Sequence, residues 1–171
     1  MPHDLNRKFK RSHFEEYGLP EHYPIPEVPN LLFYIQRNIN NNTVVYTLNK
    51  DKNGCVNQEL PLRVYWLIYK EGGVVRELNP IQTKLAYGYK SWVINDNVFR
   101  FQMVSYDQDF YLTKNNCDQF HVSTILEEEV MTISNIFVYA EDYGVFPQVK
   151  FAEFFGAKAG DGFPCYKKVQ F

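Results

Sequence analysis

The side chains best suited to bind a ligand gather in two apolar stretches, residues 33–37 and 65–69. Gln36 and Arg37 end the first stretch, immediately before a run rich in asparagine at 38–42. An arginine at a strand end can hold a carboxylate through two parallel hydrogen bonds. The alternative is an internal ion pair with a nearby Asp or Glu. The predicted ligand-binding set consists of these two residues and four aromatic ones: Tyr34, Tyr65, Trp66 and Tyr69.

Aromatic residues are unusually frequent, with 13 tyrosines and 14 phenylalanines in 171 residues. This composition favours β-strands. Tyrosines alternate with plainly apolar residues in the two stretches, which gives a sheet face that is half apolar and half polar. Such a face can line a ligand cavity, form a partner surface or pack as a second layer of core. The sequence leaves all three uses open.

Residues suited to catalysis are sparse. Cys117 lies four residues before His121, and such a pair could bind a metal or activate a thiolate. No second Cys or His lies nearby to complete a zinc set. Acidic residues recur at predicted turns, at Asp107 and Asp109, 127–129 and 141–142. If they converged they could hold calcium, and two of them in one pocket could hydrolyse a glycosidic bond. We assign no catalytic residue, no metal ligand and no cofactor.

Composition and charge limit the class of protein. A chain of this length with 45% hydrophobic residues fits one domain with one core. Its net charge of −2 gives no electrostatic reason for a nucleic-acid partner. Its three cysteines argue against a disulfide framework. No apolar run approaches the ~20 residues of a membrane span. The first residues lack a signal peptide, so we expect a cytoplasmic protein as the chain stands, and a secreted one if a leader precedes it.

Two parts are predicted along the chain. Residues 1–30 contain five of the nine prolines, four of them at 20–29, and should form an extended arm that lies across the domain through Leu19, Tyr23, Ile25 and Val28, or reaches a partner. Residues 31–171 should form a single β domain. Period-two patterns predict strands at 31–37, 43–48, 62–69, 74–78, 89–95, 98–106, 110–113, 120–126, 130–140, 149–155 and 166–171.

The connections agree with this assignment. Asparagine tolerates turn conformations, so residues 38–42 predict a hairpin loop first and a binding loop second. One short helix is expected over 79–88, with Asn79 as N-cap, Pro80 in the first turn and Gly88 just past the end. Its Ile81, Lys84 and Leu85 should share a face that covers a sheet edge. Roughly ten closely spaced strands favour an all-β, antiparallel β-sandwich, with a barrel as second choice.

Several fragments resemble a family of small β-rich proteins known as domain of unknown function 4833. They are "LFYIQRN", "NNTVVYTLN", "VYWLIYKEGG", "LNPIQTKLAYG" and "VKFAEFFGAKAGDGFP". The resemblance extends from about Leu31 to the C-terminus and implies one domain. The resemblance implies a secretion signal at the start of many members, and we expect this chain to depart from that pattern, since its first residues hold no apolar run. The family has no established activity to transfer.

Three functional hypotheses follow. The first is a non-enzymatic binding domain that recognises a protein or a small ligand through an aromatic sheet face and end loops. The second is a structural subunit that assembles through its N-terminal arm and a sheet edge, which includes a homo-oligomer. The third is a carboxylate-based enzyme acting on a sugar or lipid, which requires two acids in one pocket.

Overall fold

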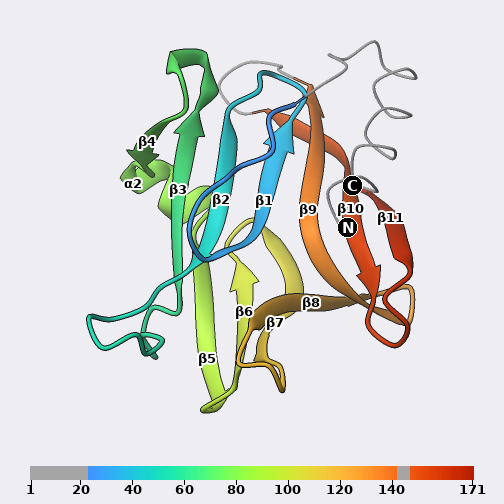
Figure 1. Ribbon diagram of the computed structural model, residues 1–171. Helices are drawn as coiled ribbons and strands as arrows, with labels where there is room; N and C mark the ends of the chain where they lie inside the picture. Colours follow the sequence, from blue (N-terminus) through green and yellow to red (C-terminus); the bar gives the residue numbers. More distant parts are fainter. Residues whose placement is uncertain (1–22, 142–146) are drawn as a thin grey trace.

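The computed structural model describes residues 23–141 and 147–171, which hold eleven strands, one short α-helix and one 3₁₀ turn (Figure 1). The all-β class is therefore confirmed. In chain order the elements are β1 (Leu31–Arg37), β2 (Thr43–Leu48), β3 (Leu62–Ile68), η1 (Tyr69–Glu71), β4 (Val74–Glu77), α2 (Pro80–Leu85), β5 (Tyr89–Asn95), β6 (Val98–Met103), β7 (Tyr106–Lys114), β8 (Phe120–Leu126), β9 (Glu129–Glu141), β10 (Gln148–Lys158) and β11 (Pro164–Gln170). Neither helix is long and apolar enough to cross a membrane in the described ranges.

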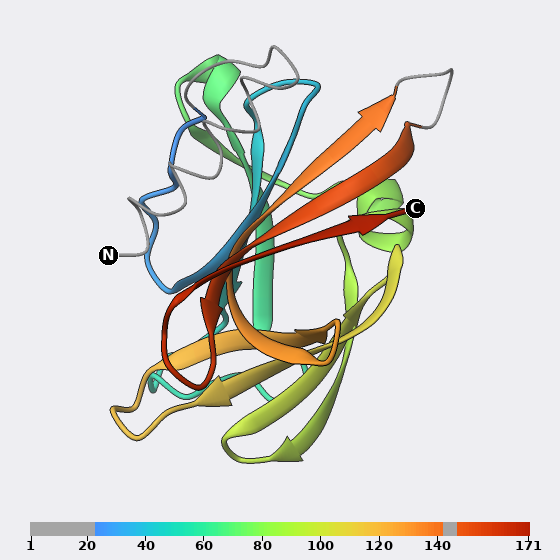
Figure 2. The same ribbon diagram turned by 90° about the vertical axis from the view of Figure 1, so that its right-hand side faces the viewer.

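All the strands belong to one sheet, in the order β4-β3-β2-β1-β9-β8-β7-β6-β5, and β10 joins β9 to β11. The long strand β9 pairs antiparallel with β8 near its start and parallel with β1 farther along. The sheet therefore divides into two parts, which we call the covered wall (β1–β3) and the open wall (β5–β8). Figure 2 shows the open wall beneath the covered wall, with β9 in orange rising from the open wall toward the upper right.

The two walls curl toward each other and nearly close between β3 and β5. The Tyr89 hydroxyl donates to the Leu62 carbonyl oxygen at 2.6 Å and accepts from the Leu62 N–H at 2.9 Å. The shape is thus a half-barrel made from one curled sheet, intermediate between the sandwich and the barrel that the sequence predicts. Most strand pairs are antiparallel, and the parallel β1–β9 pair was not foreseen.

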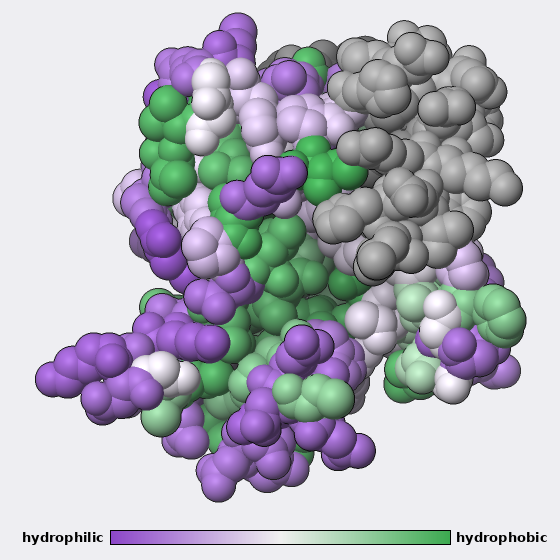
Figure 3. All heavy atoms as spheres, in the orientation of Figure 1, coloured by the Kyte–Doolittle hydropathy of each residue, from purple (hydrophilic) through white to green (hydrophobic). Residues whose placement is uncertain are grey.

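The core fills the space between the inner faces of the two walls. Phe33 of β1 stacks on Tyr46 of β2, with ring centroids 4.4 Å apart. It also lies 6.3 Å from Phe101 and from Phe110 of the open wall. Figure 3 shows hydrophobic atoms in the hollow between the upper and lower parts of the molecule, with hydrophilic residues around them. Aromatic contacts across the interior therefore add to the links that β9 and the Tyr89–Leu62 hydrogen bonds make between the two walls.

Strand bounds agree closely with the pattern of the sequence, and β1, β2, β5 and β8 match the predicted ranges. One prediction was wrong. Asp107 and Asp109 were placed in a turn, but β7 begins at Tyr106 and contains both. The chain instead turns at Val104 and Ser105. The pattern misled because alternating aspartates on an exposed strand face have the composition of a turn.

Helix α2 begins at the predicted residue, but its apolar face does not pack against the sheet edge as the sequence predicts. Asn79 caps it, and its side chain and that of Gln82 form a reciprocal capping box. The predicted apolar face is exposed, since Ile81 is 66% and Leu85 is 62% accessible. Gly88 is needed after the helix because a Cβ there would lie 1.9 Å from the Thr83 carbonyl oxygen.

Residues 23–30 cross the outer face of the covered wall, seen in blue in front of β1 and β2 in Figure 1. Tyr23 and Pro26 are buried, and Val28 packs on the outer cluster of β1–β3. The Tyr23 hydroxyl donates to the Arg37 carbonyl oxygen at 2.9 Å. Ile25 is half-buried, and Leu19, also a predicted contact of the arm, lies outside the described residues. This segment gives the covered wall a second buried layer.

Candidate functional site

The six predicted ligand-binding residues divide between two faces of the covered wall. Strand alternation places Gln36 and Arg37 on opposite faces, as the sequence predicts. Arg37 and Trp66 share the inner face, where the Arg37 guanidinium lies over the Trp66 ring. The other four lie toward the outer face or its edge: Tyr34, Gln36, Tyr65 and Tyr69. The structure therefore brings together only part of the predicted set.

The outer-face members are occupied by the fold. Gln36 is fully buried and donates through Nε2 to the Pro24 carbonyl oxygen at 2.7 Å and to Thr43 Oγ1 at 3.3 Å. Tyr34 and Tyr65 are buried and pack in one cluster, with Tyr69 at its margin. Burial raises the pKa of Tyr65 and of Tyr69. These side chains form a second core layer, one of the three uses that the sequence left open.

The inner-face members form a compact aromatic site at the end of β1, which we call the Arg37 site. The guanidinium carbon of Arg37 lies 5.0 Å from the ring centroid of Trp66 and 5.9 Å from that of Tyr87. The two rings meet edge to face with centroids 5.2 Å apart. The Trp66 indole N–H donates to Gln82 Oε1 at 3.2 Å. A flat cation is thus held against two flat rings, a geometry that the planar guanidinium favours.

Neighbouring segments fix this site in place. The Asn38 side chain donates to the Ala140 carbonyl oxygen at 3.0 Å and accepts from its N–H at 2.8 Å, which ties the end of β1 to β9. The Tyr46 hydroxyl donates to the Tyr87 carbonyl oxygen at 2.8 Å. The capping box of α2 holds Gln82. Rigid strands and a capped helix therefore position the two rings against Arg37 and the Gln82 side chain that holds Trp66.

The electrostatics of the Arg37 site are unbalanced. Among the described residues, no carboxylate lies within 4.0 Å of the Arg37 guanidinium, so the expected internal ion pair is not found there. Its Nε is buried and makes no hydrogen bond. Burial raises the pKa of Tyr87, and the charge and hydrogen bond of Arg37 oppose that rise. The arrangement can accept a planar anion on a preformed cationic and aromatic surface.

The asparagine run between β1 and β2 serves as a turn. Asn38 is bonded to β9, and Asn40 Oδ1 accepts from the Asn42 N–H at 2.9 Å. Asn42 Oδ1 accepts in turn from the Lys70 N–H at 3.3 Å. These side chains hold the loop together. The hairpin-loop interpretation of this run is therefore better supported than the binding-loop one.

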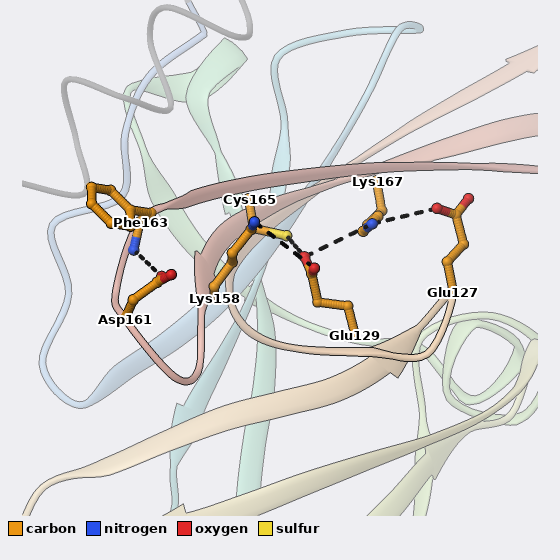
Figure 4. A network of polar contacts seen from close by, with 7 residues as sticks. All are labelled: Glu127, Glu129, Lys158, Asp161, Phe163, Cys165 and Lys167. Atoms are coloured by element: carbon orange, nitrogen blue, oxygen red, sulfur yellow. Dashed lines mark hydrogen bonds and ion pairs between the residues drawn. The ribbon is translucent and has the colours of Figure 1, made fainter.

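The acidic residues lie in separate places. Glu127 and Glu129 meet Lys167 and Lys158 where the β8–β9 turn reaches the β10–β11 hairpin (Figure 4). Glu141, at the other end of β9, pairs with Lys150 at 3.8 Å. Asp142 lies outside the described residues. No group of three or more His, Cys, Asp or Glu suited to a metal occurs in the described ranges.

None of the three cysteines is hydrogen-bonded to a histidine among the described residues. Cys165 is buried and donates to Glu129 Oε1 at 3.1 Å (Figure 4). Burial and the Glu129 carboxylate raise the pKa of this thiol to about 11, so it is a poor nucleophile at neutral pH. Cys117 is exposed in the turn after β7, and His121 lies in β8 opposite Thr113. No hydrogen bond joins Cys117 and His121, both of which are described.

Asp107 and Asp109 lie close together on β7. They line a cavity of about 310 Å³ on the open wall.

Sequence reasoning missed two members of the Arg37 site, Gln82 and Tyr87, because both lie in the helical segment expected only to cover an edge. The capping pattern located Gln82 on α2 but carried no signal that it would reach Trp66.

Comparison with known proteins places the domain in a family. A family model described as domain of unknown function DUF4833 matches residues 33–168. The chain belongs to the DUF4833 family. This confirms the resemblance seen in the sequence fragments. No curated protein and no solved structure matches the chain. Membership of DUF4833 establishes the domain and assigns no activity to it.

Proposed function

We propose that this DUF4833 domain is a non-enzymatic binding domain that holds a carboxylate-bearing ligand at the Arg37 site. The observation that carries the proposal is the Arg37 guanidinium, which lies on Trp66 and Tyr87 with no carboxylate within ion-pair distance in the described part of the chain. A partly buried charge is costly unless it is paired. An incoming carboxylate would supply the missing partner and use the guanidinium as a two-pronged donor.

Arg63 offers a matched comparison within the same wall. Its guanidinium also lies over an aromatic ring, 4.5 Å from the centroid of Tyr65. It differs in having its own carboxylate, because Arg63 Nη2 lies 2.7 Å from Glu77 Oε1. The contrast supports a ligand role for Arg37, since Arg63 already has a carboxylate partner and Arg37 has none in the described part of the chain.

The test measures carboxylate binding to three proteins: the wild-type chain, Arg37→Gln and Arg63→Gln. Succinate, benzoate and decanoate are titrated against each, with melting temperature and calorimetry as readouts. We expect at least one of these carboxylates to stabilise the wild type and Arg63→Gln, and to leave Arg37→Gln unchanged. Binding by none of them, or equal binding by Arg37→Gln, would show that the proposal is wrong.

Assembly through a sheet edge is the second candidate. The edge strand β5 exposes three consecutive apolar residues, Trp92, Val93 and Ile94, and the edge strand β4 exposes Val74 and Val75. Such edges can pair with another chain. Light scattering of the full chain and of a chain lacking residues 1–22 tests this, because residues 23–28 pack on the domain and must be kept. A monomer in both cases would rule out assembly by arm or edge.

A further inference from the structure

A second site lies on the outer face of the open wall, away from the Arg37 site on the inner face of the covered wall. Here the cavity of about 310 Å³ opens between β6, β7 and β8. Its lining combines amides, carboxylates, one aromatic ring and one aliphatic side chain: Gln102, Asp107, Gln108, Asp109, Tyr111 and Ile125. No segment in the described ranges plays the part here that residues 23–28 play on the covered wall.

Strand pairing extends this site sideways into an aromatic row. Arg100 lies directly opposite Tyr111 on one side and Trp92 on the other. The Arg100 guanidinium lies 4.4 Å from the ring centroid of Trp92, which is 39% exposed. Residues directly opposite in a sheet share a face. The cavity therefore continues into a surface made of a ring, a guanidinium and a second ring.

Hydrogen-bonding groups converge beside this row. Gln102 Nε2 donates to Asp109 Oδ1 at 2.7 Å, which orients both side chains and leaves the Gln102 carbonyl oxygen and the other Asp109 oxygen outside that bond. The Nε of Arg100 is buried without a hydrogen-bond partner. Planar amide, carboxylate and guanidinium groups can each bind two neighbouring hydroxyl groups of one ligand.

The charges at this site balance. Asp107 and Asp109 are offset by Arg100 and by Lys90, which lies opposite Gln102 on the same face. A balanced site gives little attraction to a strongly charged ligand and favours a neutral one rich in hydrogen bonds. We propose that this face binds a neutral saccharide, whose hydroxyl groups meet Gln102 and Asp109 and whose apolar ring face lies on Tyr111.

The geometry favours binding over hydrolysis. Asp107 and Asp109 are two residues apart on β7 and line the same cavity, so both lie on one side of a bound sugar. Glycoside hydrolases place their two carboxyl groups on either side of the bond that breaks. We therefore assign the two acids to recognition of the sugar. The carboxylate-enzyme hypothesis requires acids on both sides of the bond that breaks, and this pair does not meet that requirement.

The experiment titrates the full chain with glucose, galactose, mannose, N-acetylglucosamine, maltose and cellobiose, using saturation-transfer NMR and calorimetry. We expect at least one of these sugars to bind, and Tyr111→Ala and Asp109→Asn each to weaken that binding about tenfold or more. Phe163→Ala and Asp118→Asn are matched controls, because both residues are exposed and lie outside the cavity. Arg37→Gln should bind the sugar normally, which separates this proposal from the carboxylate site.

Three outcomes would overturn the saccharide proposal. The first is that none of the six sugars binds the wild type. The second is that sugar binding survives both Tyr111→Ala and Asp109→Asn, which would place the site elsewhere. The third is that butylammonium or acetate, titrated as charged probes, perturbs this face while the neutral sugars do not. Circular dichroism of each variant confirms that a loss of binding is not a loss of fold.

Discussion

The covered wall and the open wall share one core and differ on their outer faces. In the covered wall every residue of β2 is buried, because the core lies on one side and residues 23–28 with the outer cluster lie on the other. In the open wall the residues of β6 alternate between buried and half-buried. A strand covered on both faces has no side exposed to water, whereas burial alternates along a strand covered on one face.

The comparison shows that an aromatic face acquires its role from what covers it. Tyr34 and Tyr65 are buried under the arm segment and act as packing. Trp92 and Tyr111, of similar chemistry, lie on the open wall beside polar side chains. The aromatic residues of the sequence therefore occupy two different environments in one molecule, packed beneath residues 23–28 and on an open face. The predictions below test how strongly the two walls differ.

The largest effect is expected where the walls meet in the core. Phe33→Ala removes a fully buried ring that stacks on Tyr46 and contacts Phe101 and Phe110 across the interior. We expect the free energy of unfolding to fall by about 3–5 kcal/mol, from lost burial and the cavity left behind. Urea denaturation measures it. Trp92→Ala, on the open outer face, should cost about 1 kcal/mol or less; equal losses would contradict the contrast between core and outer face.

A pair of glutamines compares the two outer faces directly. Gln36→Met leaves the Pro24 carbonyl and the Thr43 hydroxyl without the buried amide that binds them, at a cost of about 1–3 kcal/mol. Gln102→Met removes only the bond to Asp109 on a face open to water, and should change stability by about 0.5 kcal/mol or less. Urea denaturation of both variants under one condition measures the two losses in free energy of unfolding. Equal costs would mean that the outer face of the covered wall is no drier than that of the open wall.

Local pattern predicted the strands well because the period of two is set within each strand. The bounds of β1, β2, β5 and β8 and the cap at Asn79 followed from neighbouring residues alone. The parallel contact of β1 with β9 joins residues about a hundred positions apart, for which a single sequence carries no signal. The same limit applies to the site, since Arg37 was identified by its position while its contact with Tyr87 depends on how the walls curl.

Alkaline pH should weaken the fold through buried and half-buried tyrosines, among them Tyr23, which bonds to β1, and Tyr89, which bonds to β3. Burial raises the pKa of Tyr23 and of Tyr89 from 10.0 to about 12. Between these values the unfolded chain has lost protons that the folded chain still holds, so stability falls as pH rises from 10 to 12. Urea midpoints at pH 8, 10, 11 and 12 should decrease in that order. In Tyr89→Phe the urea midpoint should decrease less with pH. A wild-type midpoint that does not change between pH 8 and 12 would show that these tyrosines do not have raised pKa values in the folded protein.

The smallest effect concerns reactivity, and it contrasts the core with the tip of the open wall. Cys117 in the β7–β8 turn and Cys55 in the β2–β3 loop are exposed, whereas Cys165 is buried. A disulfide reagent at pH 8 should label two thiols in the folded protein and the third only on unfolding. Glu129→Gln distinguishes the two causes of the raised pKa of Cys165, burial being the larger and the carboxylate the smaller. Labelling of Cys165 should stay slow in that variant, because its access to reagent is unchanged; labelling as fast as that of Cys117 would make the carboxylate the main protection.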